Sequence, residues 1–163
     1  MFQPFLKSGD WQKDLPSLLL ALDAFRDSDS IALLSNACAL LHWSLDDVNW
    51  TGFYLWNSSD EELVVGPFQG LPACIRIPPS RGVCGKAVSS REVQRIDDVL
   101  AFPGHIACDA ASRSELVIPI LVRGEVYGVL DIDSPTPGRF SQADQEALQH
   151  FAQKLSQLLQ DTH

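Results

Sequence analysis

The sequence predicts an α+β domain in which helices from both ends of the chain pack around an antiparallel sheet. Near each end, apolar residues recur every three or four positions, as they do along one face of a helix. The runs between the ends alternate and are rich in aromatic and β-branched residues, which is typical of strands. Short polar or glycine-containing segments separate these runs and favour hairpins.

Length and charge narrow the class of protein. The chain has 163 residues, enough to bury a core without metal or disulfide support, so we expect a single domain over residues 1–163. Its net charge of −9 argues against nucleic acid and anionic membranes as partners. The sequence shows no signal peptide and no apolar run of about 20 residues, so we expect a cytoplasmic location.

Two helices are predicted near the N-terminus. Residues 1–15 show no period and are expected to form an arm that packs on the body, whereas Pro16 suits the first turn of a helix. A second helix is predicted from the capping side chains at 27–30 to about His42 or Trp43. Its core-facing residues are expected to be Ile31, Leu34, Cys38 and Leu41. Cys38 is therefore predicted to be a small buried hydrophobe rather than a catalytic thiol.

An antiparallel hairpin is predicted next. Residues 48–56 alternate and include several aromatic side chains, and 62–65 return as a second strand after a polar turn at 57–60. Residues 66–70 are rich in turn-forming types and are expected to break the sheet. Residues 73–77, which carry the second cysteine, are expected to form a short strand.

The next segments are shorter. Residues 82–88 begin with a glycine and predict a short helix that carries Cys84. Residues 94–96 predict an edge strand, and the two aspartates at 97–98 can cap a short helical turn after it.

A second hairpin and a final helix complete the predicted fold. Residues 115–122 and 125–132 are expected to pair across the two-residue connection Arg123-Gly124. Ser141 and Asp144 have the spacing of a capping box at the start of the last helix. The apolar stripe of that helix is Leu148, Phe151, Leu155 and Leu158.

The four cysteines stand at positions 38, 74, 84 and 108, with spacings of 36, 10 and 24 residues. The sequence has no Cys-x-x-Cys pair and no Cys/His pair at finger spacing, so no structural zinc site is predicted. Permanent disulfides are rare in a reducing compartment. The thiols are therefore either buried structural side chains or groups that perform chemistry.

Cys108 lies in a loop of small residues, 104–115, directly before the most strand-like run of the chain. A nearby cation or helix N-terminus favours the reactive thiolate, and His105 and an expected helical turn at 108–111 would both supply such an effect. Asp109 opposes it. These local features leave a catalytic thiol and an ordinary buried cysteine both open.

Three carboxyl groups are expected near this loop. Asp131 and Asp133 have the two-residue spacing that places both on one face of a strand, and Glu115 begins the partner strand. Clustered carboxylates raise one another's pKa, so one of them can stay protonated and act as a general acid. The alternative is that the aspartates bind turn amides. Trp50 and Tyr54 belong either to the core or to the wall of a ligand pocket.

Seven segments of the chain, taken in order, carry a specific resemblance. They are NWTGFY (49–54), GPFQG (66–70), ACIRIP (73–78), GVCG (82–85), FPGHIACDAAS (102–112), SE (114–115) and GVLDIDS (128–134). Together they resemble the free methionine-(R)-sulfoxide reductases, enzymes built on a GAF domain, and the resemblance runs from about residue 29 to 158.

The resemblance implies a six-stranded antiparallel sheet with the N- and C-terminal helices on one face and irregular loops forming a pocket on the other, often in a homodimer. It also implies reduction of the free amino acid's (R)-sulfoxide rather than of methionine sulfoxide within proteins. In this chain Cys108 would be the nucleophile, Cys74 its disulfide partner and Cys84 an auxiliary thiol.

The same resemblance assigns roles to the polar and aromatic residues. Glu115, Asp131 and Asp133 would hold and protonate the sulfoxide oxygen. Trp50 would face the substrate's methyl group, with Tyr54 as a further substrate-binding residue.

The implied mechanism leaves Cys108 as a sulfenic acid, which condenses with Cys74 to a disulfide that thioredoxin then reduces. No metal or organic cofactor is implied. The order in which Cys74 and Cys84 act stays open. One departure from the family pattern is Arg113, which stands where a small polar residue is more usual and is expected to add a cation beside the site.

Two other classes of function remain. The chain could be a non-catalytic GAF module that binds a small molecule or senses redox state through its thiols. It could also be a thiol enzyme that reduces peroxides, which shares the sulfenic acid chemistry but is indifferent to the sulfoxide enantiomer.

Overall fold

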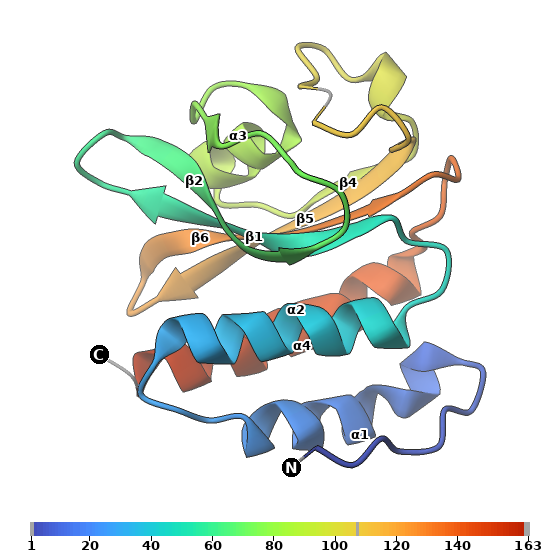
Figure 1. Ribbon diagram of the computed structural model, residues 1–163. Coiled ribbons are helices and arrows are strands. Elements are labelled where there is room, and N and C mark those ends of the chain that lie inside the picture. The colour runs from blue at the N-terminus through green and yellow to red at the C-terminus, as the bar shows by residue number, and fades with distance from the viewer. Residues whose placement is uncertain (1, 107, 162–163) are drawn as a thin grey trace.

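One sheet with helices on both of its faces makes up the fold (Figure 1). The computed structural model describes residues 2–106 and 108–161. The helices are α1 (Trp11–Ala24), α2 (Ser30–Ser44), α3 (Gly82–Ser90) and α4 (Gln142–Gln160), with a 3-10 turn η1 (Val99–Ala101). Figure 1 shows α2 and α4 against one face of the sheet, α1 outside them, and α3 with the longer loops over the other face.

The sheet contains six antiparallel strands in the order β3-β2-β1-β6-β5-β4. They are β1 (Trp50–Asn57), β2 (Glu62–Gln69), β3 (Arg76–Ile77), β4 (Gln94–Ile96), β5 (Ser114–Val122) and β6 (Glu125–Ser134). The predicted α+β class, with terminal helices on one face of a six-stranded antiparallel sheet, is confirmed. In the part of the chain described, no helix combines the length and apolar character that crossing a membrane requires.

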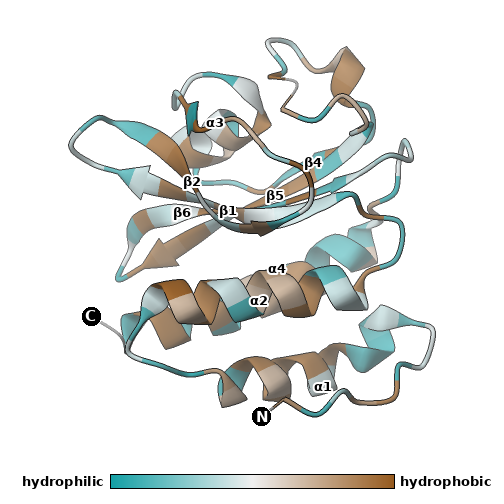
Figure 2. Cartoon of the chain, in the orientation of Figure 1, coloured by the Kyte–Doolittle hydropathy of each residue, from teal (hydrophilic) through white to brown (hydrophobic). Residues whose placement is uncertain are grey.

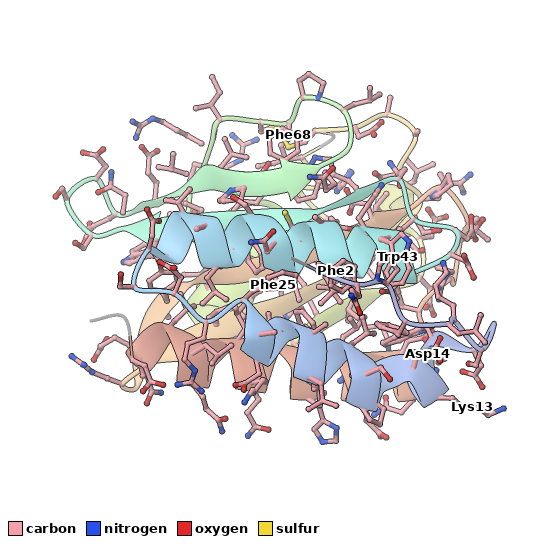
Figure 3. The ribbon with its side chains drawn as sticks, turned by 60° about the horizontal axis from the view of Figure 1, so that its bottom comes forward. Phe2, Lys13, Asp14, Phe25, Trp43 and Phe68 are labelled. Atoms are coloured by element: carbon pink, nitrogen blue, oxygen red, sulfur yellow. A yellow bond between two sulfur atoms is a disulfide. The ribbon has the colours of Figure 1, made fainter. Side chains whose placement is uncertain are left out.

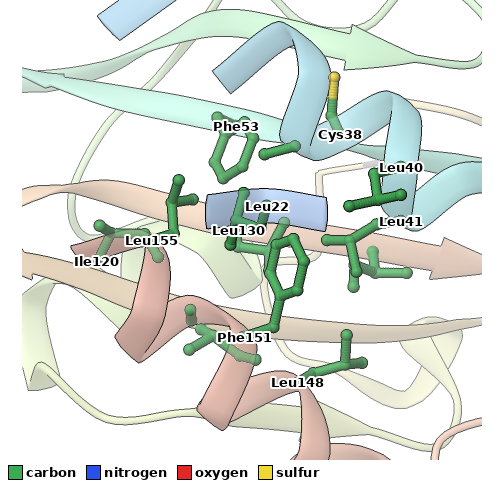
Figure 4. Close-up of a cluster of buried hydrophobic side chains, with 14 of the residues drawn as sticks. Leu22, Cys38, Leu40, Leu41, Phe53, Ile120, Leu130, Leu148, Phe151 and Leu155 are labelled. Atoms are coloured by element: carbon green, nitrogen blue, oxygen red, sulfur yellow. The ribbon is translucent and has the colours of Figure 1, made fainter. Parts of the chain in front are cut away.

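The helix-facing side of the sheet is a continuous apolar core. Leu130 and Ile132 of β6 are fully buried there, together with Phe53 of β1 and Phe151 of α4. Figure 4 shows side chains from the helices and strands meeting in this cluster, and Figure 2 shows hydrophobic residues along the same elements. Cys38 is 1% exposed within it, so its predicted role as a buried hydrophobe is confirmed. Burial of one such large side chain contributes about 2–3 kcal/mol.

Two of the predicted local signals are present in the structure. Ser141 and Asp144 form the capping box of α4, each side chain accepting a hydrogen bond from the other residue's backbone N–H. Arg123 and Gly124 connect β5 to β6, and both have positive φ, 53° and 82°. That geometry matches the twist of adjacent antiparallel strands, which is why a two-residue connection suffices.

The predicted start of the first helix at Pro16 is wrong, because α1 begins five residues earlier at Trp11. The side chain of Asp10 caps the helix by accepting from the Gln12 N–H, and Trp11 Nε1 donates to Asp144 at 2.9 Å. The second contact crosses 133 residues of sequence. A local pattern cannot reveal such an anchor, and the proline is the first helix-start signal that the sequence shows.

The residues before α1 pack on the body, as predicted for an N-terminal arm. The ring of Phe2 lies 5.7 Å from that of Phe25 and 6.0 Å from that of Trp43 (Figure 3). Phe5 also contacts the Trp43 ring edge-on, and Lys7 Nζ donates to the Trp43 carbonyl at 3.0 Å. The arm thus covers the outer side of α1 and α2.

The predicted break of the sheet at residues 66–70 is wrong, because β2 continues to Gln69. Gly66 and Pro67 together oppose Phe53, which makes a bulge between the pairs Gly52–Phe68 and Tyr54–Val65. A bulge tolerates proline, which lacks the N–H that a regular ladder needs. The predicted strand 73–77 is correspondingly short, with only Arg76–Ile77 paired, and this leaves Cys74 in a loop.

The predicted core position of Ile31 is wrong, because the residue is 55% exposed. The buried side of α2 also includes Leu33, Ala37 and Leu40, so it is centred away from Ile31. Ile31 lies at the margin of that face, one residue after the start of the helix.

Candidate active site

A small cavity of about 30 Å³ lies on the sheet face opposite α1, α2 and α4. Helix α3 supplies Cys84 to its lining, and the loop before β5 supplies Cys108. The central strands supply Glu115, Asp131 and Asp133. The structure therefore brings the three predicted acids and two of the predicted thiols to one place.

Strand register explains why the carboxyl groups converge. β6 pairs with β5 so that Asp133 lies opposite Glu115. Because side chains alternate along a strand, Asp131 and Asp133 share the cavity face of β6, while Leu130 and Ile132 face the helices. The predicted common face of the two aspartates is confirmed.

Cys108 is bonded to Cys74 in a disulfide, with the two Cα atoms 5.2 Å apart. Cys74 comes from the loop before β3 and Cys108 from the loop before β5, so the bond joins two loops that are 34 residues apart in the sequence. Both cysteines are partly exposed. Cys38 and Cys84 are free and buried.

Cys84 lies against the carboxyl groups. Its Sγ is 3.4 Å from Asp131 Oδ2 and 3.9 Å from Glu115 Oε1. Burial raises the pKa of the Cys84 thiol well above its usual value, and the negative charges of Asp131 and Glu115 raise it further. The thiol is therefore protonated near neutral pH and acts as a hydrogen-bond donor to these acids.

The three carboxyl groups hold protons more tightly than free carboxyl groups do. Burial is the largest cause of the raised pKa of Glu115, followed by the charges of Asp131 and Asp133. Burial also raises the pKa of Asp131 to about 6 and that of Asp133 well above its usual value. At neutral pH the cluster thus contains a proton that it can donate, which is what a general acid requires.

Tyr54 and Trp50 form an aromatic floor near the disulfide. The Tyr54 hydroxyl donates to the Cys74 carbonyl at 3.1 Å and lies 4.0 Å from Cys108 Sγ. Trp50 stacks on Tyr54, with ring centroids 5.8 Å apart, and its Nε1 donates to the Leu71 carbonyl at 3.1 Å. Tyr54 lines the cavity and Trp50 lies behind it, so a substrate contact for Trp50 remains a prediction.

A hydrogen-bond network that the sequence analysis missed fixes Asp133. Asn49 Nδ2 donates to Asp109 Oδ2 at 2.9 Å and to Ser112 Oγ at 3.1 Å. Ser112 Oγ in turn donates to Asp133 Oδ2 at 3.0 Å. Asn49 begins the NWTGFY segment, but nothing local shows that its amide reaches the Cys108 loop 60 residues away.

The loop around Cys108 does not open a helical turn as predicted. Asp109 Oδ1 accepts the Ala111 N–H at 2.8 Å and the Asp109 carbonyl accepts the Ser112 N–H at 3.2 Å, so residues 109–112 make one isolated turn and no helix. His105 lines the cavity, but burial lowers its pKa, so its imidazole is largely neutral at pH 7. Activation of Cys108 by a helix N-terminus or by an imidazolium therefore has no support in this geometry.

Arg113 does not add a cation at the cavity as expected. Its guanidinium pairs with Asp98 at 3.4 Å, at the start of η1, and it is not among the residues that line the cavity. The Arg113 N–H donates to the Ser134 carbonyl and the Arg113 carbonyl accepts from the Val99 N–H, which fixes the residue directly before the start of β5.

The fold and the site together define a class of protein. The family model of the GAF domain matches residues 24–159, which is most of the chain. The cavity with its thiols and acids lies on the sheet face opposite the terminal helices, where a pocket was expected.

Similarity to known proteins is high over the whole chain. Protein YtsP of Bacillus subtilis is 55% identical over 98% of this chain and 99% of its own length. The free methionine-R-sulfoxide reductase of Escherichia coli is 48% identical over 94% of this chain and 88% of its own length. The structure of the Neisseria meningitidis free methionine-R-sulfoxide reductase, determined with its substrate, superposes with a TM-score of 0.88 at 36% identity, covering 99% of this chain and 95% of the other. The chain belongs to the free methionine-R-sulfoxide reductase family of GAF-domain proteins.

Proposed function

We propose that this protein reduces free L-methionine (R)-sulfoxide to methionine. The observation that carries the proposal is that Cys108 lines one cavity together with the carboxyl groups of Glu115, Asp131 and Asp133, whose pKa values are all raised. A sulfoxide sulfur becomes electrophilic when its oxygen is protonated or strongly hydrogen-bonded. The site supplies both a sulfur nucleophile and a retained proton.

In the first step the Cys108 thiolate attacks the sulfoxide sulfur while Glu115 or Asp133 protonates the oxygen. The methionine sulfur gains two electrons and the Cys108 sulfur loses two, so methionine leaves and Cys108 carries the oxygen as a sulfenic acid. Asp131 holds the substrate in the cavity, and the aromatic floor of Trp50 and Tyr54 faces its methyl group.

In the second step the Cys74 thiol condenses with the sulfenic acid, releasing water and forming the disulfide. The Cα distance of 5.2 Å between Cys74 and Cys108 supports this pairing. A thioredoxin dithiol then reduces the bond by exchange, which its partial exposure permits. Cys84 serves as an auxiliary thiol, and the protein needs no resident cofactor.

The disulfide form is a closed state of the site. A volume of about 30 Å³ holds little more than a single water molecule, far less than an amino acid. Reduction of the Cys74–Cys108 bond releases the loop that carries Cys108, and the substrate then enters. We further propose that the protein works as a cytoplasmic homodimer.

An enantiomer-resolved assay tests the proposal. The reduced protein, with thioredoxin, thioredoxin reductase and NADPH, is given free methionine (R)-sulfoxide, free (S)-sulfoxide and a peptide that contains methionine sulfoxide. Turnover of the free (R) form alone is expected, and Cys108→Ser is expected to abolish it. Equal turnover of all three substrates, or full activity in Cys108→Ser, contradicts the proposal. Fast peroxide consumption without sulfoxide turnover supports the peroxidase alternative instead.

A further inference from the structure

Cys84, Glu115 and Asp131 present three ligand atoms to one point of the cavity. The sulfur of Cys84 and one oxygen of each carboxyl group all lie within 4.8 Å of one another. The two sulfur–oxygen distances are 3.4 Å and 3.9 Å. With Zn–S of about 2.3 Å and Zn–O of about 2.1 Å, a tetrahedral zinc site has a sulfur–oxygen edge of about 3.6 Å. The observed edges bracket that value.

A second observation points to a ligand at the same place. Asp131 is 5% exposed, and its Oδ1 has no hydrogen-bond partner in the structure, although it belongs to a residue that lines the cavity. Four carboxyl groups line the cavity, with Asp109 as the fourth, and no lysine or arginine is among the described lining residues. A buried oxygen without a donor, in a cavity of negative groups, calls for a proton or a cation.

We propose that Cys84, Glu115 and Asp131 form a binding site for a thiophilic divalent cation, with Zn²⁺ as the ion that fits best. The thiolate selects zinc over magnesium and calcium, which prefer all-oxygen ligands. The three protein ligands leave a fourth position for water. When the ion binds, Cys84 and the carboxyl groups release the protons that they hold, and the new bonds are Zn–S and Zn–O.

The site overlaps the substrate cavity, so the cation and methionine sulfoxide exclude each other. This consequence, which rests on the proposed function, makes zinc a competitive inhibitor that leaves the Cys74–Cys108 pair chemically intact. Binding of the ion itself does not depend on the proposed function and is measured without turnover.

The test uses the full-length protein in both its reduced and its disulfide form. Binding of zinc chloride is measured by calorimetry, and cobalt chloride serves as a spectroscopic probe because cobalt–thiolate bonds absorb in the near ultraviolet. Removing a residue that only supports a metal ligand weakens metal binding by about 10- to 100-fold. Cys84→Ser removes a ligand itself, so it is expected to weaken zinc binding by at least about 100-fold. Asp131→Asn is expected to weaken it as well.

Cys38→Ser is the matched control, because Cys38 is the other buried free thiol and lies on the opposite face of the sheet. It is expected to keep the zinc affinity and the cobalt absorption of the parent protein. Circular dichroism at the assay temperature establishes that each variant is folded. The proposal is overturned if zinc fails to bind in both redox forms, if Cys84→Ser binds as tightly as the parent, or if magnesium or calcium at equal concentration displaces zinc. If zinc binds but the zinc-free protein does not reduce methionine sulfoxide, the metal site is supported and only the proposed function is refuted.

Discussion

The two faces of the sheet bury groups of opposite character. On the helix side, Leu130, Ile132 and Phe151 fill an apolar core, and Cys38 is one more hydrophobe within it. On the other side, Asp131 of the same strand is buried with Cys84 and Glu115, and Asp133 is half-buried beside them. Burial raises the pKa of both free thiols, that of Cys38 to about 11, but only Cys84 has acids as neighbours. One face therefore provides stability, and the other holds protons at a cost in stability.

The largest effect expected from this comparison is on the helix face. Phe151→Ala removes a fully buried ring from the core, and such changes destabilise proteins by about 3–5 kcal/mol. Urea unfolding followed by circular dichroism measures the loss. A change below about 1 kcal/mol would show that this core does not dominate the stability.

A substitution on the cavity face is expected to raise the free energy of unfolding rather than lower it. The raised pKa of Asp131 means that the folded chain holds a proton which the unfolded chain releases, so this group lowers stability as pH rises from its usual value of 3.8 to about 6. The shift corresponds to about 3 kcal/mol. Asp131→Asn should therefore gain stability relative to the parent between pH 4 and pH 7, and the gain includes the relief of Glu115 and Asp133, whose pKa the Asp131 charge raises.

Unfolding free energies of both proteins across that pH interval provide the measurement. Using the difference between the two removes the contributions of carboxyl groups whose pKa is lowered, such as Asp23 and Asp144. A constant difference at all pH values would mean that Asp131 is not held protonated by the fold.

The sequence predicted the fold better than the site because most elements depend on local signals. The Arg123-Gly124 connection and the Ser141–Asp144 box act within a few residues, and both are present. The start of α1 and the length of β2 depended instead on a contact from Trp11 to Asp144 and on a bulge at Gly66 and Pro67, which only the folded chain reveals.

For the site, local chemistry left Cys108 and the acids with open roles, and the family resemblance supplied their assignments. What sequence reasoning could not supply is the environment of each group. The network from Asn49 through Ser112 to Asp133 spans distant segments, and the direction of the Arg113 side chain follows from Asp98. Such features depend on strand register and loop geometry rather than on residue type.

A smaller effect is expected from the network that holds Asp133. The hydrogen bond from Ser112 to Asp133 Oδ2 lowers the pKa of Asp133. Ser112→Ala removes this bond, so the pKa of Asp133 is expected to rise further in the variant. A decrease in kcat/KM of about tenfold is expected, equal to the roughly 1.4 kcal/mol of one hydrogen bond. The alkaline limb of the pH profile should also move to higher pH.

Ser89→Ala on the exposed side of α3 is the control, because the Ser89 hydroxyl donates to the Lys86 carbonyl of its own helix and Ser89 does not line the cavity. It should leave both kcat/KM and the pH profile unchanged. If Ser112→Ala lowers activity without moving the pH profile, the serine supports the loop alone and does not tune Asp133.

The smallest effect is expected at Arg113. Its pair with Asp98 is partly exposed, and pairs of this kind contribute about 0–1 kcal/mol. Arg113→Asn should change kcat/KM by less than about twofold, as should Asp98→Asn. A large change in KM for Arg113→Asn alone would place its charge at the substrate after all.

A single turnover of the reduced Cys74→Ser variant tests the central claim most directly. Without Cys74, the oxidised nucleophile persists long enough to be labelled by a reagent specific for sulfenic acids, and peptide mass spectrometry locates the label. Free methionine (R)-sulfoxide is expected to yield about one methionine per chain, with the label on Cys108. Methionine formation with the label on Cys84, or no methionine from protein whose thiols are fully reduced, would contradict the account.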